Sequence, residues 1–275
     1  MSYFKNFPLI KYRFGNEIEP VFIKDISVYV DLVDQLKDQV AYYANYTIVD
    51  GERPDTLAYK LYGDVSYYWT FFLLNPQLRE QGWPLSVGDA YELSEKKYAN
   101  YATQYDGGPV FASPGGWYKN GTDSNTVLAE ILPVGSEVTV QGTSLNYAQA
   151  EVVRRNLDIG QIILKYLSGD ESVMTDIRSI TYIDTSGDIY SAAVSFGRFF
   201  NNVVEYNAPK YYKNSAGDRV DIDPYDIDTS TSSLTPVTYQ EEFIDQNDAV
   251  KVIKVFKKDV IDNVVSEFNR QLKNG

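Results

Sequence analysis

The spacing of the apolar residues changes twice along this sequence, and that change limits its fold more than any other feature. Before about residue 100 and after about residue 250, apolar residues recur every three or four positions, as they do on one face of a helix. Between about 101 and 235 this spacing fades, Gly, Ser, Thr and Asn become frequent, and short alternating runs appear. The sequence therefore predicts an α+β fold in which a β-rich region interrupts helical segments.

The first hundred residues predict an extended arm followed by short helices. Residues 1–25 mix aromatic residues with prolines, and a helix is expected over about 25–43. A strand over 46–49 precedes a helix over 54–62 that ends at Gly63, and a second helix runs from Asp64 until Asn75 and Pro76 end it. Ser86 and Asp89 form a capping box, which predicts a further helix to about Tyr98.

The remaining residues predict short strands and a closing helix. Strands are expected over four runs whose spacing fits a small antiparallel barrel or sandwich: 137–141, 148–154, 161–165 and 179–184. Residues 207–235 are interpreted as a loop or linker with at most one hairpin. The last segment predicts a strand over 250–256 and a helix that begins at Lys258 or Asp259.

These patterns divide the chain into four parts. The predicted parts are an N-terminal arm and helix (1–45), a helical unit (46–100), an inserted β-rich region with loops (101–235) and a C-terminal strand and helix (236–275). A chain of 275 residues can bury a core of this kind without disulfides.

Histidine and cysteine are both absent, which restricts the chemistry open to the chain. No Ser-His-Asp or Cys-His arrangement, His-ligated zinc site or thiolate nucleophile can be built, so carboxylate chemistry alone remains open. The net charge of −13 disfavours a nonspecific nucleic-acid surface. No secretion signal or membrane span of ~18 to 20 apolar residues is recognisable, so we expect a protein that stays in the cytoplasm where it is made, unless an assembled particle or lysis carries it out.

Aromatic residues make up 15% of the chain, including 24 tyrosines. Such rings favour contacts with partner proteins, although the β-propensity of tyrosine explains part of the excess equally well. The aromatic residues that we expect at partner interfaces are Tyr3, Phe4, Phe7, Tyr12, Tyr67, Tyr68, Trp83 and Phe268.

Residues 46–76 carry a pattern that resembles a LysM unit: a strand, a turn, Asp-Thr-Leu, a helix ending in Tyr-Gly, and a second helix that carries Trp and ends in Asn. The residues that match this pattern are Tyr46, Asp55, Leu57, Tyr62, Gly63, Trp69 and Asn75. The order of the arm, the 25–43 helix, this unit, the 86–98 helix and the closing strand and helix resembles the T-even-type phage baseplate wedge family known as gene product 53. This resemblance covers roughly residues 1–100 and 236–275, and residues 126–183 resemble a small β-module that is inserted in some phage tail and virion proteins.

The resemblance implies a structural, non-enzymatic subunit of a contractile phage tail in the virion. Such subunits join neighbouring wedges of a sixfold baseplate through contacts with other wedge proteins and the sheath-initiator protein. Together with the composition and charge, this leads us to expect no cofactor, no metal, no nucleic acid and no membrane partner.

Three alternatives remain open on the residues alone. The LysM-like unit could bind peptidoglycan glycans through Trp69 or Tyr68, although one unit offers only a shallow groove. The acidic run 221–228 could hold a calcium ion, but it lacks the Gly and the distal Glu of an EF-hand loop. A cell-wall hydrolase would need two suitably spaced carboxylates, and adjacent pairs such as Glu241 and Glu242 are expected by chance.

Overall fold

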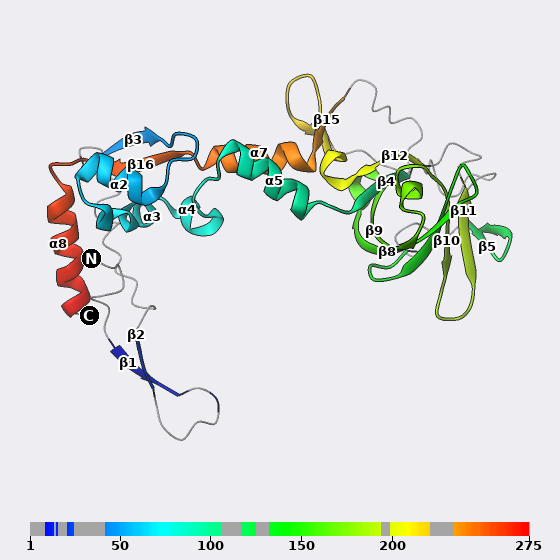
Figure 1. The fold of residues 1–275 in the computed structure, drawn as a ribbon, viewed down its shortest axis with the longest axis horizontal. Coiled ribbons are helices and arrows are strands. Elements are labelled where there is room, and N and C mark those ends of the chain that lie inside the picture. Colours follow the sequence, from blue (N-terminus) through cyan, green and yellow to red (C-terminus); the bar gives the residue numbers. More distant parts are fainter. Residues whose placement is uncertain are drawn as a thin grey trace. The chain divides into compact units, whose positions relative to one another are not determined.

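The computed structural model describes residues 9–13, 15, 21–24, 42–105, 117–124, 132–193, 199–220 and 234–274. The chain forms two compact units: unit 1 contains Met1–Ala90 and Asp245–Gly275, and unit 2 contains Tyr91–Ile244. The α+β fold class is confirmed, since both helices and antiparallel sheets are present (Figure 1). The predicted helix over 25–43 lies outside the described residues.

Unit 1 is built around a pair of strands that are distant in sequence. Strand β3 (Tyr43–Thr47) pairs antiparallel with β16 (Val252–Phe256), and Ala44 lies opposite Val255. Between them in the chain come α2 (Pro54–Tyr62), the short 3-10 helix η3 (Val65–Tyr67), α3 (Trp69–Leu74) and α4 (Pro76–Gln81). Helix α8 (Ile261–Asn274) follows β16 and confirms the predicted C-terminal strand and helix.

Local sequence signals set the ends of the first helices. Pro54 occupies the first turn of α2, and Gly63 ends the helix in the left-handed region at φ 80°, where its N–H donates to Tyr59 O at 2.8 Å. Asp64 then accepts a hydrogen bond from Ser66 N–H at 2.8 Å and caps η3. The helix predicted from Asp64 is therefore split into η3 and α3.

Pro76 ends one helix and begins another. The sequence pattern predicted only the end at this position, but α4 starts at Pro76 itself, because proline fits the first position of a helix, where no N–H is needed.

The core of unit 1 joins the helices to the C-terminal segment. Trp69 on α3 lies against Phe268 on α8, with ring centroids 4.5 Å apart. Fully buried Leu57, Phe71 and Leu78 from the helices share this cluster with Ile253 from β16. Burying apolar side chains of this size is the main favourable term in folding, so residues 250–268 are part of this unit's core.

A partly buried polar cluster fixes the turn between β3 and α2. Glu52 accepts hydrogen bonds from Tyr46 OH at 2.9 Å, from Lys60 Nζ at 3.1 Å and from Val49 N–H at 3.2 Å. Burial alone would raise the pKa of Glu52, but these donors outweigh it and lower that pKa. Trp83 Nε1 donates to the Glu52 carbonyl at 2.7 Å, which ties the segment after α4 to the same turn.

Unit 1 also contains a two-stranded hairpin near the N-terminus. Strand β1 (Leu9–Tyr12) pairs antiparallel with β2 (Val21–Lys24), and Ile10 lies opposite Ile23. Directly opposed residues share a face of a sheet, so one face carries Ile10, Tyr12, Val21 and Ile23. That face is apolar and aromatic throughout.

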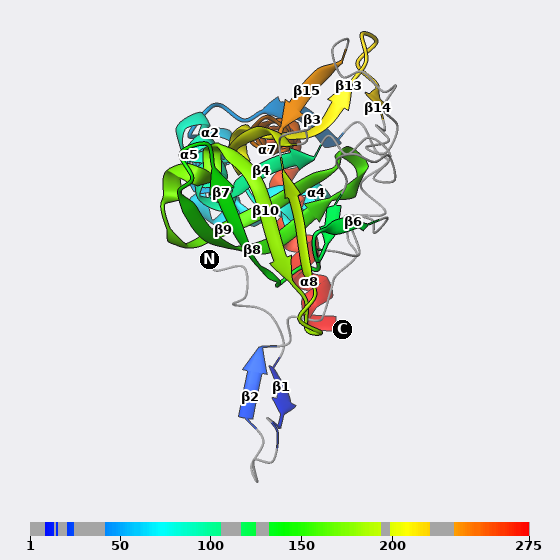
Figure 2. The same ribbon diagram turned by 90° about the vertical axis from the view of Figure 1, so that its right-hand side faces the viewer.

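The described strands of unit 2 include a nine-stranded antiparallel sheet, ordered β12-β4-β9-β8-β7-β10-β11-β5-β6 (Figure 2). Its strands are β4 (Tyr101–Tyr105), β5 (Trp117–Lys119), β6 (Thr122–Ser124), β7 (Glu137–Gly142), β8 (Tyr147–Asn156), β9 (Gln161–Gly169), β10 (Ile177–Ile183), β11 (Ile189–Ala193) and β12 (Phe199–Val204). The four strands predicted in this region correspond to β7, β8, β9 and β10.

The sheet curls so that edge strand β12 comes close to β10, where Asn202 Nδ2 donates to Ile177 O at 3.4 Å. The inner face of the curl is the apolar core, formed by alternating residues such as Val138, Val140 and Ile180. The small antiparallel barrel or sandwich expected from the sequence stays a prediction.

Residues 207–235 contain more structure than predicted. Strand β13 (Pro209–Lys213) forms the expected hairpin with β14 (Arg219–Val220), and it also pairs with β15 (Thr235–Thr238). Short 3-10 helices η4 (Leu157–Ile159), η5 (Glu171–Thr175) and η7 (Glu205–Asn207) join strands of this unit.

Two helices contain the points where the chain changes unit. The predicted 86–98 helix is α5 (Val87–Lys97), and Asp89 N–H donates to Ser86 Oγ at 3.2 Å as expected of a cap. Helix α7 (Tyr239–Ala249) was not predicted. It begins with a reciprocal capping box, in which Thr238 N–H donates to Glu241 Oε2 at 2.8 Å and Glu241 N–H donates to Thr238 Oγ1 at 3.1 Å.

Candidate functional site

The residues of the LysM-like pattern come together in unit 1, where most of them support the fold. Leu57, Tyr62 and Trp69 are buried in the core, and Gly63 ends α2. Tyr62 OH donates to Phe256 O at 3.1 Å, and burial raises the pKa of this phenol. Trp69 is only 8% exposed and lies against Phe268, so its ring is not presented for stacking on a sugar.

Three further residues of the pattern have polar roles. Asp55 forms an ion pair with Arg53 at 3.2 Å at the exposed start of α2, and Tyr46 belongs to the cluster around Glu52. Asn75 is buried and bonds to both backbone groups of Lys254 at 2.8 Å, which attaches the end of α3 to β16. These contacts stabilise the unit.

The aromatic residues expected at partner interfaces lie in different environments. Tyr3, Phe4 and Phe7 fall outside the described residues. Tyr12 on β1 is 48% exposed and Tyr68 is 38% exposed, as an interface role requires before a partner binds. The other three are placed as follows: Tyr67 OH donates to Asp262 Oδ1 at 2.9 Å, Trp83 is partly buried beside Phe71 and Phe72, and Phe268 is buried within unit 1.

The β1–β2 hairpin presents several exposed apolar side chains. Leu9 is 58% exposed and Phe22 is 60% exposed, while Val21 and Ile10 on the other face are 46% and 36% exposed. An isolated two-stranded hairpin is marginally stable in water, and a contiguous exposed apolar face is a common mark of a protein interface. The hairpin is therefore the candidate docking element of unit 1.

The carboxylates singled out from the sequence do not form a metal or hydrolase site in the parts of the chain that the structure describes. The acidic run 221–228 lies outside those parts, and within them no group of three or more Asp or Glu residues is arranged to hold a metal ion. Glu241 caps α7, and Glu242 forms an ion pair with Lys210. No helix among the described residues has the length and apolar composition needed to cross a membrane.

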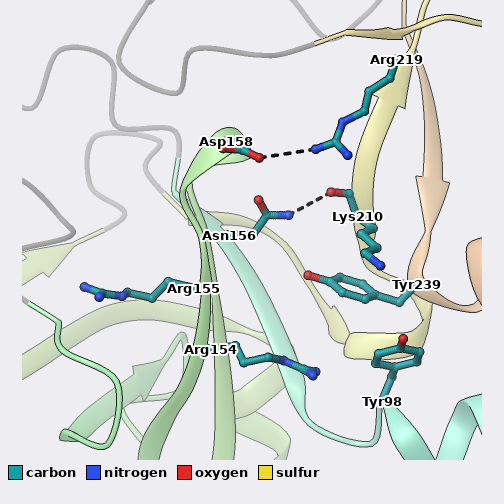
Figure 3. A pocket seen from close by; sticks show the side chains of 8 residues that line it. All are labelled: Tyr98, Arg154, Arg155, Asn156, Asp158, Lys210, Arg219 and Tyr239. Carbon is teal, nitrogen blue, oxygen red and sulfur yellow. Dashed lines mark hydrogen bonds and ion pairs between the residues drawn. The ribbon is translucent and has the colours of Figure 1, made fainter.

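Unit 2 contains an open cleft of about 550 Å³ that sequence reasoning missed (Figure 3). One wall comes from the end of β8 and from η4, which contribute Arg154 and Asp158, and the other comes from β13 and β14, which contribute Lys210 and Arg219. Tyr98, which follows α5, and Tyr239, at the start of α7, line the remaining side.

Polar contacts span the cleft and hold its walls. Asn156 Nδ2 donates to Lys210 O at 2.9 Å, and Arg219 Nη2 forms an ion pair with Asp158 Oδ2 at 3.4 Å (Figure 3). The Tyr239 hydroxyl donates to Gln161 Oε1 at 3.0 Å, and burial raises the pKa of this phenol. The only local sequence signal for this cleft is the adjacent pair Arg154 and Arg155. The walls of the cleft come from segments far apart in the chain, which no local pattern predicts.

Comparison with known protein families matches one part of the chain. Residues 4–108 match the family model described as base plate wedge protein 53. No curated protein matches the chain. The family match supports a structural role in a phage tail baseplate. It covers the hairpin, α2, α3, α4 and α5, but not α8.

Proposed function

We propose that this protein is a structural subunit of a phage baseplate wedge in the virion tail, and that it acts through protein–protein contacts without a catalytic step or cofactor. The observation that carries the proposal is the match of residues 4–108 to the base plate wedge protein 53 family. The finer role is to join neighbouring wedges of a sixfold, contractile baseplate, in contact with other wedge proteins and the sheath-initiator protein. The subunit would be made in the host cytoplasm before it joins the particle.

The β1–β2 hairpin supports a role in assembly. It lies within the matched range and carries an apolar face whose residues Ile10, Tyr12 and Val21 are 36 to 48% exposed. Burying such side chains against a neighbouring subunit stabilises the contact by about 1.5 to 3 kcal/mol per large apolar residue. The hairpin would then be a docking arm.

The arrangement of unit 1 supports a framework role for its LysM-like part. Strand β3 and helices α2 and α3 come first in the chain, and β16 from the C-terminal segment pairs with β3 to complete a β-α-α-β arrangement. Two residues of the LysM-like pattern, Trp69 and Asn75, make their contacts within the unit. We therefore assign this part to scaffolding, with the exposed hairpin and the exposed Tyr68 directed to partner proteins.

The test uses the phage that encodes the chain, with Ile10→Ser and Val21→Ser introduced together. We expect these changes to weaken docking by about 3 kcal/mol or more, about a hundredfold in affinity, and to deplete the protein from purified baseplates. Quantitative mass spectrometry of the baseplates measures that depletion, and electron cryo-microscopy locates the chain in intact tails.

Lys11→Ser on the opposite face of the hairpin is the matched control, and we expect it to leave incorporation unchanged. The proposal is overturned if the wild-type chain is absent from purified tails, or if tails form in normal yield without its gene. Normal incorporation of the double variant would overturn the docking role of the hairpin.

A further inference from the structure

We propose that the cleft of unit 2, lined by Arg154, Lys210, Arg219, Tyr98 and Tyr239, binds an acidic peptide segment of a partner protein. Apart from Tyr98, these residues lie outside the range that matches the known family. The inference therefore goes beyond the proposed function and does not depend on it.

The charged groups of the cleft are held in place before any ligand binds. The Arg154 guanidinium lies 5.6 Å from the centre of the Tyr98 ring, and its ion pair with fully buried Glu205 anchors it from behind. Lys210 Nζ lies 5.6 Å from the centre of the Tyr239 ring and forms an ion pair with Glu242. A cation whose position is already fixed loses less conformational entropy when a carboxylate binds it.

The aromatic residues give the cleft a second kind of surface. The ring centroids of Tyr98 and Tyr239 lie 5.1 Å apart and the rings tilt by 49°, so they form one connected aromatic patch. Figure 3 shows Arg154 and Lys210 directed toward this patch, while Arg155 points away from it. Tyr and Arg together are the residues most enriched at energetically important positions of protein interfaces.

The charge of the cleft selects the ligand class. The lining contains one carboxylate, Asp158, and four cations, of which Arg155 points away from the tyrosine rings (Figure 3). Asp158 and Arg219 are both largely exposed and 3.4 Å apart, so their ion pair is weak and a carboxylate of a partner can replace Asp158. Arg and Lys side chains also carry more donors than one carboxylate uses, so the paired Arg154 and Lys210 can bind a second acceptor.

The rest of the molecule argues against a nucleic acid as the ligand. A long polyanion would meet the field of a chain with net charge −13, whereas a short acidic peptide contacts mainly the local cations. The tyrosine patch adds contacts for an apolar or aromatic residue between the acidic ones. An extended peptide that alternates carboxylates with aromatic residues fits both surfaces.

Binding is measured by fluorescence anisotropy of the full-length protein with a fluorescein-labelled peptide of Asp-Tyr-Gly repeats. The same peptide with Asn in place of Asp is the uncharged control ligand. The test variant is Lys210→Gln with Arg219→Gln, and its matched control is Lys165→Gln with Arg178→Gln, which removes the same charge from exposed positions elsewhere in unit 2. We expect the test variant to weaken binding about fivefold or more and the control to change it less than about twofold.

A third variant keeps the test decisive if the first one does not fold. Asp158→Asn removes the exposed carboxylate from the cleft, so we expect it to bind the acidic peptide about twofold more tightly than wild type. The proposal is overturned if wild type shows no binding at millimolar peptide, if the Asn peptide binds equally well, or if the control variant loses as much affinity as the test variant. Tighter binding of a single-stranded oligonucleotide of equal charge would also overturn it.

Discussion

Asn75 joins two segments of unit 1 that lie 179 residues apart in sequence. Its Nδ2 donates to Phe71 O and Lys254 O, both at 2.8 Å, and its Oδ1 accepts from Lys254 N–H at 2.8 Å. The side chain is 2% exposed, so water cannot replace these bonds. One amide therefore closes the end of α3 and satisfies both backbone groups of a residue in β16.

Replacing Asn75 with Ala is expected to lower the free energy of unfolding of unit 1 by about 2 to 4 kcal/mol, because the hydrogen bonds to Phe71 O and to both backbone groups of Lys254 are lost together. Urea unfolding followed by tryptophan fluorescence measures the change, since Trp69 and Trp83 lie in this unit. Asn263→Ala, at an exposed position of α8, is the matched control and should change stability by less than about 0.5 kcal/mol. Equal stability of the two variants would contradict the bridging role.

At the scale of elements, the pairing between the start of β8 and the end of β9 depends on one glycine, Gly169, which lies opposite Ala148. Gly169 has φ 99°, and a Cβ built there would lie 2.5 Å from Tyr147 O and 2.9 Å from Ala148 Cα. Both obstacles are backbone atoms of the neighbouring strand, so a side chain at this position would force β8 and β9 apart. The close approach continues to Asp170, whose N–H donates to Tyr147 O at 3.0 Å.

Gly169→Ala is therefore expected to destabilise unit 2 by about 3 kcal/mol or more, as strain and overpacking act together. Gly187→Ala is a close control, because Gly187 also has positive φ, at 86°, but no atom lies within 4 Å of the position that a Cβ would take there. We expect the control to cost only about 1 to 2 kcal/mol from backbone strain. Thermal unfolding of the two variants, monitored by circular dichroism, compares the costs, and equal midpoints would refute the steric argument.

The elements that could be predicted from sequence are those with strong local signals. Gly63, Asp64 and Ser86 mark helix ends correctly, and alternation along β7 and β8 identifies these strands before their partners are known. Helix α7 was missed because few apolar residues mark a face on it, although the Thr238 and Glu241 capping box was readable. Element ends are thus encoded by two or three neighbouring residues.

The pairing of β3 with β16 and the unit 2 cleft could not be predicted in this way. Each brings together residues from distant segments, and no local pattern specifies such contacts, because register is set by packing against the rest of the core. The interface role expected of Phe268 shows the same limit. Its spacing with Val264 marks an apolar helix face, but only the structure shows that this face lies against Trp69.

At the scale of the whole molecule, the two units have separate apolar cores. The core of unit 1 is drawn from residues 48–78 and 250–268. This unit therefore needs the chain segments on both sides of unit 2 in the sequence. The main core of unit 2 is drawn from residues 132–180, and a smaller, separate cluster contains Tyr98, Ile163 and Tyr239. A mutation in one core should therefore act first on its own unit.

This separation predicts a reciprocal pattern for two core substitutions in the full-length chain. Phe268→Ala removes a ring that lies against Trp69, and we expect it to lower the stability of unit 1 by about 3 to 5 kcal/mol. Ile162→Ala empties a fully buried position in β9, and we expect it to lower the stability of unit 2 by about 2 to 5 kcal/mol. Hydrogen exchange resolves the two effects, because amides of β3 and β16 report on unit 1 and amides of β8 and β9 report on unit 2. Loss of protection in both units from either substitution would contradict this separation and show that the chain unfolds as one cooperative body.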